Sequence, residues 1–194
     1  IYGGALGYLD FTGNLDTCIA IRMAVKQAGK VTVQAGGGIV EDEIKELAER
    51  MKGIQGQFSA LADQDAKVFA PLAKCYSLPS GTEEEKAYKA EVMEARLLDA
   101  SLVPMEIMEK AWEMLEIMDI LADKGSRMAV SDVGVGVQFI RTALLGAVMN
   151  VYINTKSMKN REKAEEMNEK AERLIKEGTE AADRIYQKVL EQLR

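Results

Sequence analysis

Hydrophobic residues recur at three- and four-residue spacing over most of the chain after residue 40, which is the pattern of amphipathic helices. One stripe predicts a long first helix that ends near residue 72; its members are Ile44, Leu47, Met51, Ile54, Phe58, Leu61, Ala62, Ala66, Phe69 and Leu72. The segment 76–81 contains Pro79 and Gly81, both helix breakers, and is expected to be the loop that follows this helix.

The pattern predicts three more helical stretches. Thr82 and Glu85 have the spacing of a capping box and are expected to start a helix that runs to about Ser101. Pro104 suits the first turn of the next helix, whose methionines between 105 and 118 favour core filling over an adaptable binding surface. The last helix is expected over 160–194, with an apolar seam typical of antiparallel packing in a bundle or of a coiled-coil dimer.

The stretch 131–154 has no polar face. Ser131 or Asp132 could cap its start, and apolar residues then point to every side of the helix. Such a helix is either buried or spans a membrane. Arg141 and Asn150 interrupt the run and charged segments flank it, so we expect the central helix of a soluble bundle and no membrane partner.

Residues 1–40 are rich in glycine and β-forming residues. They predict a small three-stranded antiparallel sheet with turns at Gly13-Asn14 and Gly29-Lys30 and with strands at Gly4–Phe11, Cys18–Lys26 and Val31–Gln34. The predicted fold class is therefore mainly α, an antiparallel helical bundle with a small N-terminal antiparallel β segment. The two parts are expected to form separate domains, 1–40 and 41–194.

The composition restricts the chemistry. A net charge of −6 and a pI near 5.0 argue against nucleic acid as a partner. The sequence contains no histidine, which excludes catalytic triads and metal sites that depend on it. Cys18 and Cys75 lack metal-ligand spacing and are read as free thiols, which favours a cytoplasmic location. Any catalysis must therefore use carboxylates, amides, hydroxyls, lysine or backbone groups.

Two groups of polar residues could carry chemistry. Asp63 and Asp65 lie about 200° apart around a helix axis, and Asp65 falls on the apolar stripe. A carboxylate there is costly unless it is paired or functional, so a structural ion pair, a partly exposed aspartate and a catalytic role all remain open. Asn150 and Asn154 share one face of the central helix and suit either interhelical hydrogen bonds or recognition of an amide-rich heterocycle.

The N-terminal stretch GYLDFTGNLDTCIAIRMAV, followed by VQAGGGIV, resembles the catalytic domain of chorismate-utilising enzymes, especially anthranilate synthase component I. The resemblance covers about residues 3–40. It implies that Arg22 and the backbone of Gly36 to Gly38 correspond to groups that hold chorismate carboxylates in that family.

A second resemblance covers about residues 45–190. LADQDAKVFAPLAKCYSLP, EEEKAYKAEVMEA and SDVGVGVQFIRTALLGAVMNVYINTKSM are similar to the cyclodeaminase domain of formiminotransferase-cyclodeaminase and to methenyltetrahydrofolate cyclohydrolases. The resemblance implies a helical, homodimeric folate enzyme, a lyase or a hydrolase. It would cyclodeaminate 5-formiminotetrahydrofolate or hydrolyse 5,10-methenyltetrahydrofolate, with the tetrahydrofolate derivative as substrate and with no metal.

The resemblance implies that Asp65 or Asp63 is catalytic. The candidate substrate-binding residues are Ser131, Asp132, Asn150 and Asn154 for the pterin or the one-carbon unit, and Arg141 and Arg127 for the glutamate tail. One rival hypothesis is a non-catalytic helical dimerisation module, in which both aspartates are exposed and no pocket converges on the two asparagines. Another is a fragment of a chorismate-utilising enzyme.

Overall fold

The computed structural model describes residues 5–9, 15–19, 24–27, 30–33 and 42–194. Internal contacts divide the chain into two units, Ile1–Ile39 and Val40–Arg194. Arg22 and the glycines of residues 36–38 lie outside the described residues.

The described strands form two separate hairpins. Strands β1 (Ala5–Leu9) and β2 (Leu15–Ile19) pair antiparallel, as do β3 (Ala24–Gln27) and β4 (Lys30–Val33). The prediction of one three-stranded sheet is wrong, because the expected middle strand 18–26 is divided between β2 and β3. Two-stranded hairpins bury little apolar surface. The predicted fold class is therefore corrected from a helical bundle with a small β segment to a mainly α fold. That fold is a bundle of long helices formed by residues 42–194, and the small β segment is not a component of it.

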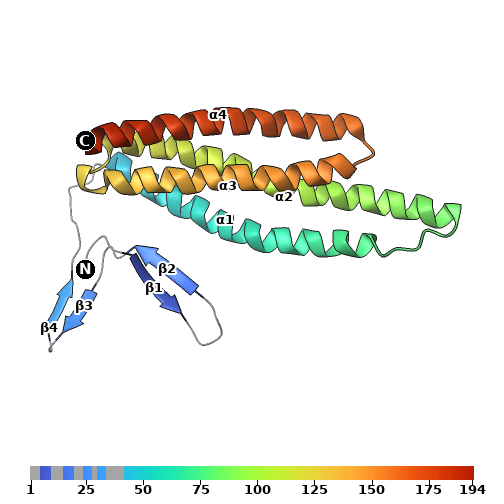
Figure 1. Cartoon of the computed structure of the whole chain (residues 1–194), viewed down its shortest axis with the longest axis horizontal. Coiled ribbons are helices and arrows are strands. Elements are labelled where there is room, and N and C mark those ends of the chain that lie inside the picture. Colours follow the sequence, from blue (N-terminus) through green and yellow to red (C-terminus); the bar gives the residue numbers. More distant parts are fainter. Residues whose placement is uncertain (1–4, 10–14, 20–23, 28–29, 34–41) are drawn as a thin grey trace. The chain divides into compact units, whose positions relative to one another are not determined.

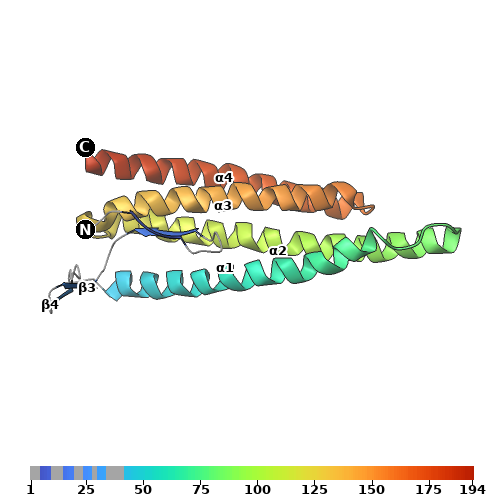
Figure 2. The ribbon, with the colours of Figure 1, turned by 60° about the horizontal axis from the view of Figure 1, so that its bottom comes forward.

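Four helices run up and down along one axis (Figures 1 and 2). They are α1 (Asp42–Cys75), α2 (Glu83–Lys124), α3 (Val130–Ser157) and α4 (Arg161–Leu193), with a 3₁₀ turn, Arg127–Ala129, before α3. Helix α2 packs against each of the other three helices, and α3 also packs against α4. The capping box of Thr82 and Glu85 is present at the start of α2, as the sequence predicted.

Helix α2 is continuous through Pro104, where the sequence predicted a break between two helices. Proline has no N–H and therefore leaves the carbonyl oxygen four residues earlier, that of Ala100, without its helical donor. Asn154 Nδ2 on α3 donates to Ala100 O at 3.0 Å and supplies the missing bond. A side chain from a neighbouring helix thus allows one 42-residue helix to form in place of two shorter ones.

Methionine fills the core as predicted. Met105, Met108, Met114 and Met118 are all buried along α2. They belong to two clusters that join α2 to α3 and α4. The seam of α4 is buried in the same clusters through Met167, Ala171, Ala182, Ile185 and Val189, so α4 uses its apolar face inside the chain and not in a coiled-coil dimer.

Helix α3 is not buried on all sides, which corrects the prediction for the central helix. Its inner face is buried through Val137, Leu144, Val148 and Val151. Its opposite face exposes large apolar side chains, including Phe139 at 71% and Ile153 at 66%. Within the described part, the segment Arg127–Ser157 is long and apolar enough to cross a membrane by length and composition, and 28% of its most apolar window is buried in the bundle.

Candidate functional site

The two aspartates of α1 lie in different environments. Asp65 is half-buried and Asp63 is exposed, as expected from their separation around the helix. Neither forms a hydrogen bond or an ion pair with another described residue. Asp65 is therefore an unpaired carboxylate at the edge of the α1–α2 interface. The bundle does not use it as a structural ion pair, so of the two structural alternatives left open by the sequence its environment agrees with a partly exposed aspartate.

Helices α1 and α3 reach the same level of α2, from different positions around it. Val68 of α1 packs against the cluster that contains Leu72, Leu97 and Ala100. Asn154 of α3 donates to the carbonyl oxygen of the same Ala100. Asp65 lies one turn before Val68, and Asn150 lies one turn before Asn154. The predicted catalytic carboxylate and the predicted amides are thus brought to one level of the bundle, near the middle of α2.

The remaining predicted residues on α3 face solvent. Arg127, Ser131 and Asp132 are exposed at its N-terminal end, and Ala129 is the N-cap, without a side-chain cap from Ser131 or Asp132. Asn150 is also exposed. Residues 131 and 150 are 19 positions apart, about 28 Å along the helix, so the N-terminal group lies far from the level of Ala100.

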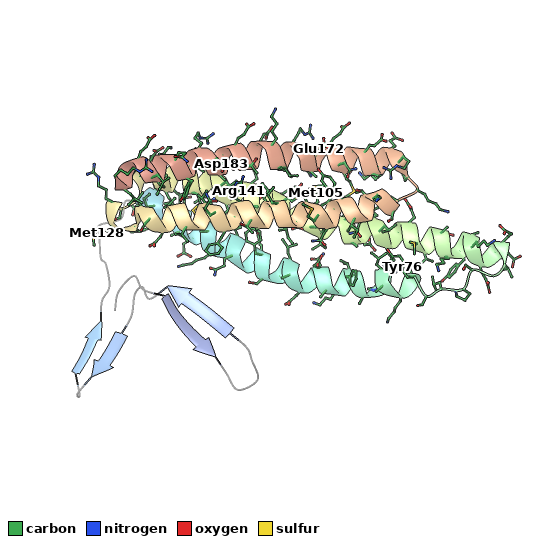
Figure 3. The ribbon with its side chains drawn as sticks, in the orientation of Figure 1. Tyr76, Met105, Met128, Arg141, Glu172 and Asp183 are labelled. Carbon is green, nitrogen blue, oxygen red and sulfur yellow. The ribbon has the colours of Figure 1, made fainter. Side chains whose placement is uncertain are left out.

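Arg141 has a partner inside the chain. Its Nε donates to Asp183 Oδ1 on α4 at 3.1 Å, and Figure 3 shows the two side chains on facing parts of α3 and α4. The Arg141 side chain is 33% exposed and that of Asp183 is 60% exposed. Asp183 partly neutralises the charge of Arg141, so an anionic ligand would meet less positive charge there. Arg127 forms no ion pair with a described residue, so its full charge is available.

Two surface pockets lie elsewhere on the bundle. The first, about 470 Å³, lies where the start of α2 meets the α3–α4 turn; its lining includes Glu94, Leu98, Met158, Lys159, Asn160 and Lys163. The second, about 390 Å³, lies between the ends of α2 and α4 and includes Trp112, Asp119 and Arg184. Neither pocket is lined by a predicted site residue, so within one chain these residues do not share either cavity.

Glu94 is a residue to which the sequence interpretation gave no role. Its carboxylate accepts hydrogen bonds from the backbone N–H groups of Lys159 (2.6 Å) and Asn160 (2.9 Å), and it thereby fixes the α3–α4 turn to α2. Asn160 in turn caps α4 through Lys163 N. Glu94 belongs to the EEEKAYKAEVMEA motif, so the resemblance marked its segment without indicating what this carboxylate does.

An ion-pair network lines the second pocket. Asp119 accepts from Lys188 Nζ and Arg184 Nη2, both at 2.8 Å, and Lys188 also donates to Asp123 at 2.9 Å. Burial raises the pKa of Asp119, but its hydrogen bonds and the charges of Lys188 and Arg184 outweigh burial, so this pKa lies below its ordinary value. Hydrogen bonds to the two aspartates raise the pKa of Lys188. This network holds α4 against α2, and the charged partners of Asp119 and Lys188 are all engaged in ion pairs.

Comparison with known proteins identifies the family. The family model described as formiminotransferase-cyclodeaminase matches residues 19–173. The chain belongs to the formiminotransferase-cyclodeaminase family. It is 32% identical over 150 residues to a methenyltetrahydrofolate cyclohydrolase of Methylorubrum extorquens, a match that covers 77% of this chain and 72% of that protein. The resemblance stated from the sequence is thereby confirmed.

A solved structure has the same fold. The crystal structure of formiminotetrahydrofolate cyclodeaminase from Thermotoga maritima matches with a TM-score of 0.62 and 22% identity, over 82% of this chain and 74% of that one. The formiminotransferase-cyclodeaminase fold is therefore the fold of this bundle.

The N-terminal resemblance is also confirmed, over a short stretch. Anthranilate synthase component 1 of Acetivibrio thermocellus is 60% identical over 45 residues, which is 23% of this chain and 9% of that enzyme. About nine-tenths of that enzyme's length thus has no counterpart in the match.

Among the described residues, no group of three or more His, Cys, Asp or Glu side chains could hold a metal ion.

Proposed function

We propose that this chain is a folate one-carbon enzyme that hydrolyses 5,10-methenyltetrahydrofolate to 10-formyltetrahydrofolate. The observation that carries the proposal is the 32% identity to a methenyltetrahydrofolate cyclohydrolase over 77% of this chain and 72% of that protein. Cyclodeamination of 5-formiminotetrahydrofolate is the second candidate, supported by the family to which the chain belongs and by its fold.

The reaction needs one proton shuttle. Water adds to the carbon that bridges N5 and N10, the bond from that carbon to N5 breaks, and the formyl group stays on N10. One proton of the water passes to N5 and the other is released to solvent. A carboxylate that takes a proton from the water and returns it to N5 performs this transfer without histidine.

We assign that role to Asp65. It is half-buried beside α2, and no described residue pairs with it, so it can accept and return a proton without breaking an ion pair. Asp63 is exposed, and solvent competes there for contact with a substrate. Asn150 is the proposed amide partner of the pterin, because its side chain has no hydrogen bond to a described residue. Asn154 Nδ2 is occupied by Ala100 O, which leaves its amide oxygen as the atom that could face a ligand.

The roles of Arg127 and Arg141 toward the anionic tail of the folate stay predictions from the sequence, since Arg141 is paired with Asp183 and Arg127 lies before α3, far from the level of Asn150. Ser131 and Asp132 lie in the exposed first turn of α3, about 28 Å from Asn150, and their ligand-binding roles likewise stay predictions from the sequence. The cytoplasmic location and the domain boundary at residue 40 stay predictions from the sequence.

The test is turnover by the purified chain. With 5,10-methenyltetrahydrofolate we expect loss of the methenyl ultraviolet absorbance at a rate proportional to enzyme concentration, above the rate in buffer alone. With 5-formiminotetrahydrofolate, ammonia release reports the second candidate. Absence of both activities, together with no folate binding by calorimetry at millimolar ligand, would contradict the proposal and favour the dimerisation module.

A further inference from the structure

The side-chain amide of Asn154 is held in one orientation at the junction of α2 and α3. Its Nδ2 donates to Ala100 O at 3.0 Å, the carbonyl that lacks a helical donor because Pro104 has no N–H. A carbonyl oxygen only accepts hydrogen bonds, so the nitrogen of the amide must be the atom that faces it. A half-turn of the amide would place two acceptors, Asn154 Oδ1 and Ala100 O, against each other.

The oxygen of this amide is available to a ligand. Asn154 is half-buried, and no described residue donates a hydrogen bond to its Oδ1. Every buried side-chain nitrogen or oxygen in the described part of the chain has a partner, so this oxygen, which has none, is open to solvent. A ligand group that binds at Oδ1 must therefore be a hydrogen-bond donor.

The end of α3 that carries Asn154 is also held from α4. Thr155, the next residue, is fully buried, and its Oγ1 donates to Asn168 Oδ1 at 2.7 Å. Arg161 Nη1 donates to Thr155 O at 2.9 Å. Helix α3 thus cannot turn about its axis to present another atom of Asn154 without breaking contacts with both α2 and α4.

We propose that Pro104 and Asn154 together make the site selective for a 2-amino pteridine over a 2-oxo pteridine, an inference that rests on the proposed folate activity. The pterin of a folate carries an amino group at C2, and this donor faces Asn154 Oδ1. A 2-oxo pteridine has an acceptor at the same place, and the fixed amide cannot turn to donate to it. Asn154 is then the specificity-determining residue, and Pro104 is a positioning residue that acts through it.

This assignment agrees with the role given to Asp65. The 2-amino group and N5 lie at opposite ends of the pterin ring system. An anchor at Asn154 therefore holds the reacting end of the ring away from α3, as proton transfer by a carboxylate on α1 requires. The selection acts on binding of the ring and not on the chemical step, so it is expected in KM and in the dissociation constant, and kcat should change little.

Calorimetry of the full chain with tetrahydrofolate and with its 2-deamino-2-oxo analogue tests the selection. We expect tetrahydrofolate to bind the unaltered chain at least about tenfold more tightly, because the analogue leaves a polar group of the site unpaired. Pro104→Ala supplies a backbone N–H to Ala100 O and frees the amide to turn, so the preference should fall at least about threefold. Pro71→Ala is the matched control, because Pro71 also lies inside a helix but on α1, and should leave the preference unchanged.

A second variant tests the same selection without relying on Pro104. The hydroxyl in Asn154→Ser can accept from a 2-amino group or donate to a 2-oxo group, so the ratio of the two affinities should approach one. Circular dichroism checks that each variant is folded. The ratio is the decisive quantity, because a purely structural role of either residue would weaken both ligands equally.

The outcomes separate this selection from the proposed function. Equal binding of both ligands by the unaltered chain, or a preference that survives Pro104→Ala and Asn154→Ser, would overturn the selection while turnover of 5,10-methenyltetrahydrofolate continues. A chain that binds neither ligand and turns over no folate would overturn the proposed function and the selection together.

Discussion

The Asn154–Ala100 contact predicts a measurable coupling with Pro104. Pro104 removes the helical donor of Ala100 O, and Asn154 Nδ2 replaces it at 3.0 Å. Ala100 is 4% exposed, so this carbonyl has little access to water. Truncation in Asn154→Ala should reduce the free energy of unfolding by about 1–2 kcal/mol, between the net value of a hydrogen bond and the cost of an unsatisfied buried carbonyl.

The same truncation should cost much less when Pro104 is absent. Pro104→Ala returns a backbone N–H that can donate to Ala100 O, so Asn154 is no longer needed there. We expect Asn154→Ala to cost about 0.5 kcal/mol or less in the Pro104→Ala chain, which makes the coupling in the double-mutant cycle about 1 kcal/mol. Asn150→Ala, one turn away and exposed, is the matched control and should change stability by at most about 0.5 kcal/mol.

Urea unfolding, followed by the circular dichroism of the helices, measures the free energy of unfolding of all four chains in the cycle. In thermal unfolding, a change of 1 kcal/mol corresponds to a shift in Tm of about 2–4 °C for a chain of this size. Equal costs of Asn154→Ala in both backgrounds would refute the claim that this amide supports the unbroken α2. A loss of folate binding without a loss of stability would instead place Asn154 in the ligand site.

Three further predictions concern packing and charge. Gly178→Ala should be less stable than Gly56→Ala by about 1–3 kcal/mol in urea unfolding, because a Cβ at Gly178 collides with Leu144 whereas one at Gly56 meets nothing within 4 Å. Lys188→Met should cost about 1 kcal/mol near neutral pH. That cost should shrink at acid pH, as Asp119 loses its charge on protonation at its lowered pKa, below the ordinary 3.8. It should also shrink at alkaline pH, as Lys188 loses its charge at its raised pKa, above the ordinary 10.5. Thr82→Ala should reduce the free energy of unfolding by about 1 kcal/mol in thermal unfolding, because the N-cap of α2 is lost.

The sequence predicted those parts of the fold that depend on local pattern. The apolar stripe of α1, the capping box of α2 and the packed seam of α4 all follow from spacing along one helix. The prediction of a helix break at Pro104 was wrong, because the hydrogen-bond donor to Ala100 O is the side-chain amide of Asn154, more than fifty residues later in the chain. The prediction that α3 is buried on all sides was wrong. Periodicity shows which sides of a helix are apolar, but tertiary contacts decide which of those sides a neighbouring helix covers.

The candidate site was predictable as residue types and only partly as geometry. The helical stripe correctly distinguished half-buried Asp65 from exposed Asp63. The pairing of Arg141 with Asp183 could not be read from the sequence, because Asp183 lies on another helix among many exposed charges. Glu94 was missed for a similar reason, since its partners are backbone N–H groups at a turn 65 residues away.

The most direct test of the proposed function compares Asp65→Asn with Asp63→Asn. The two substitutions remove the same charge from the same helix, two residues apart, and differ in whether the carboxylate is half-buried or exposed. In hydrolysis of 5,10-methenyltetrahydrofolate we expect kcat to fall at least about a hundredfold for Asp65→Asn, as for loss of a general base, and less than threefold for Asp63→Asn. Equal rates for both variants and the unaltered chain would contradict the account.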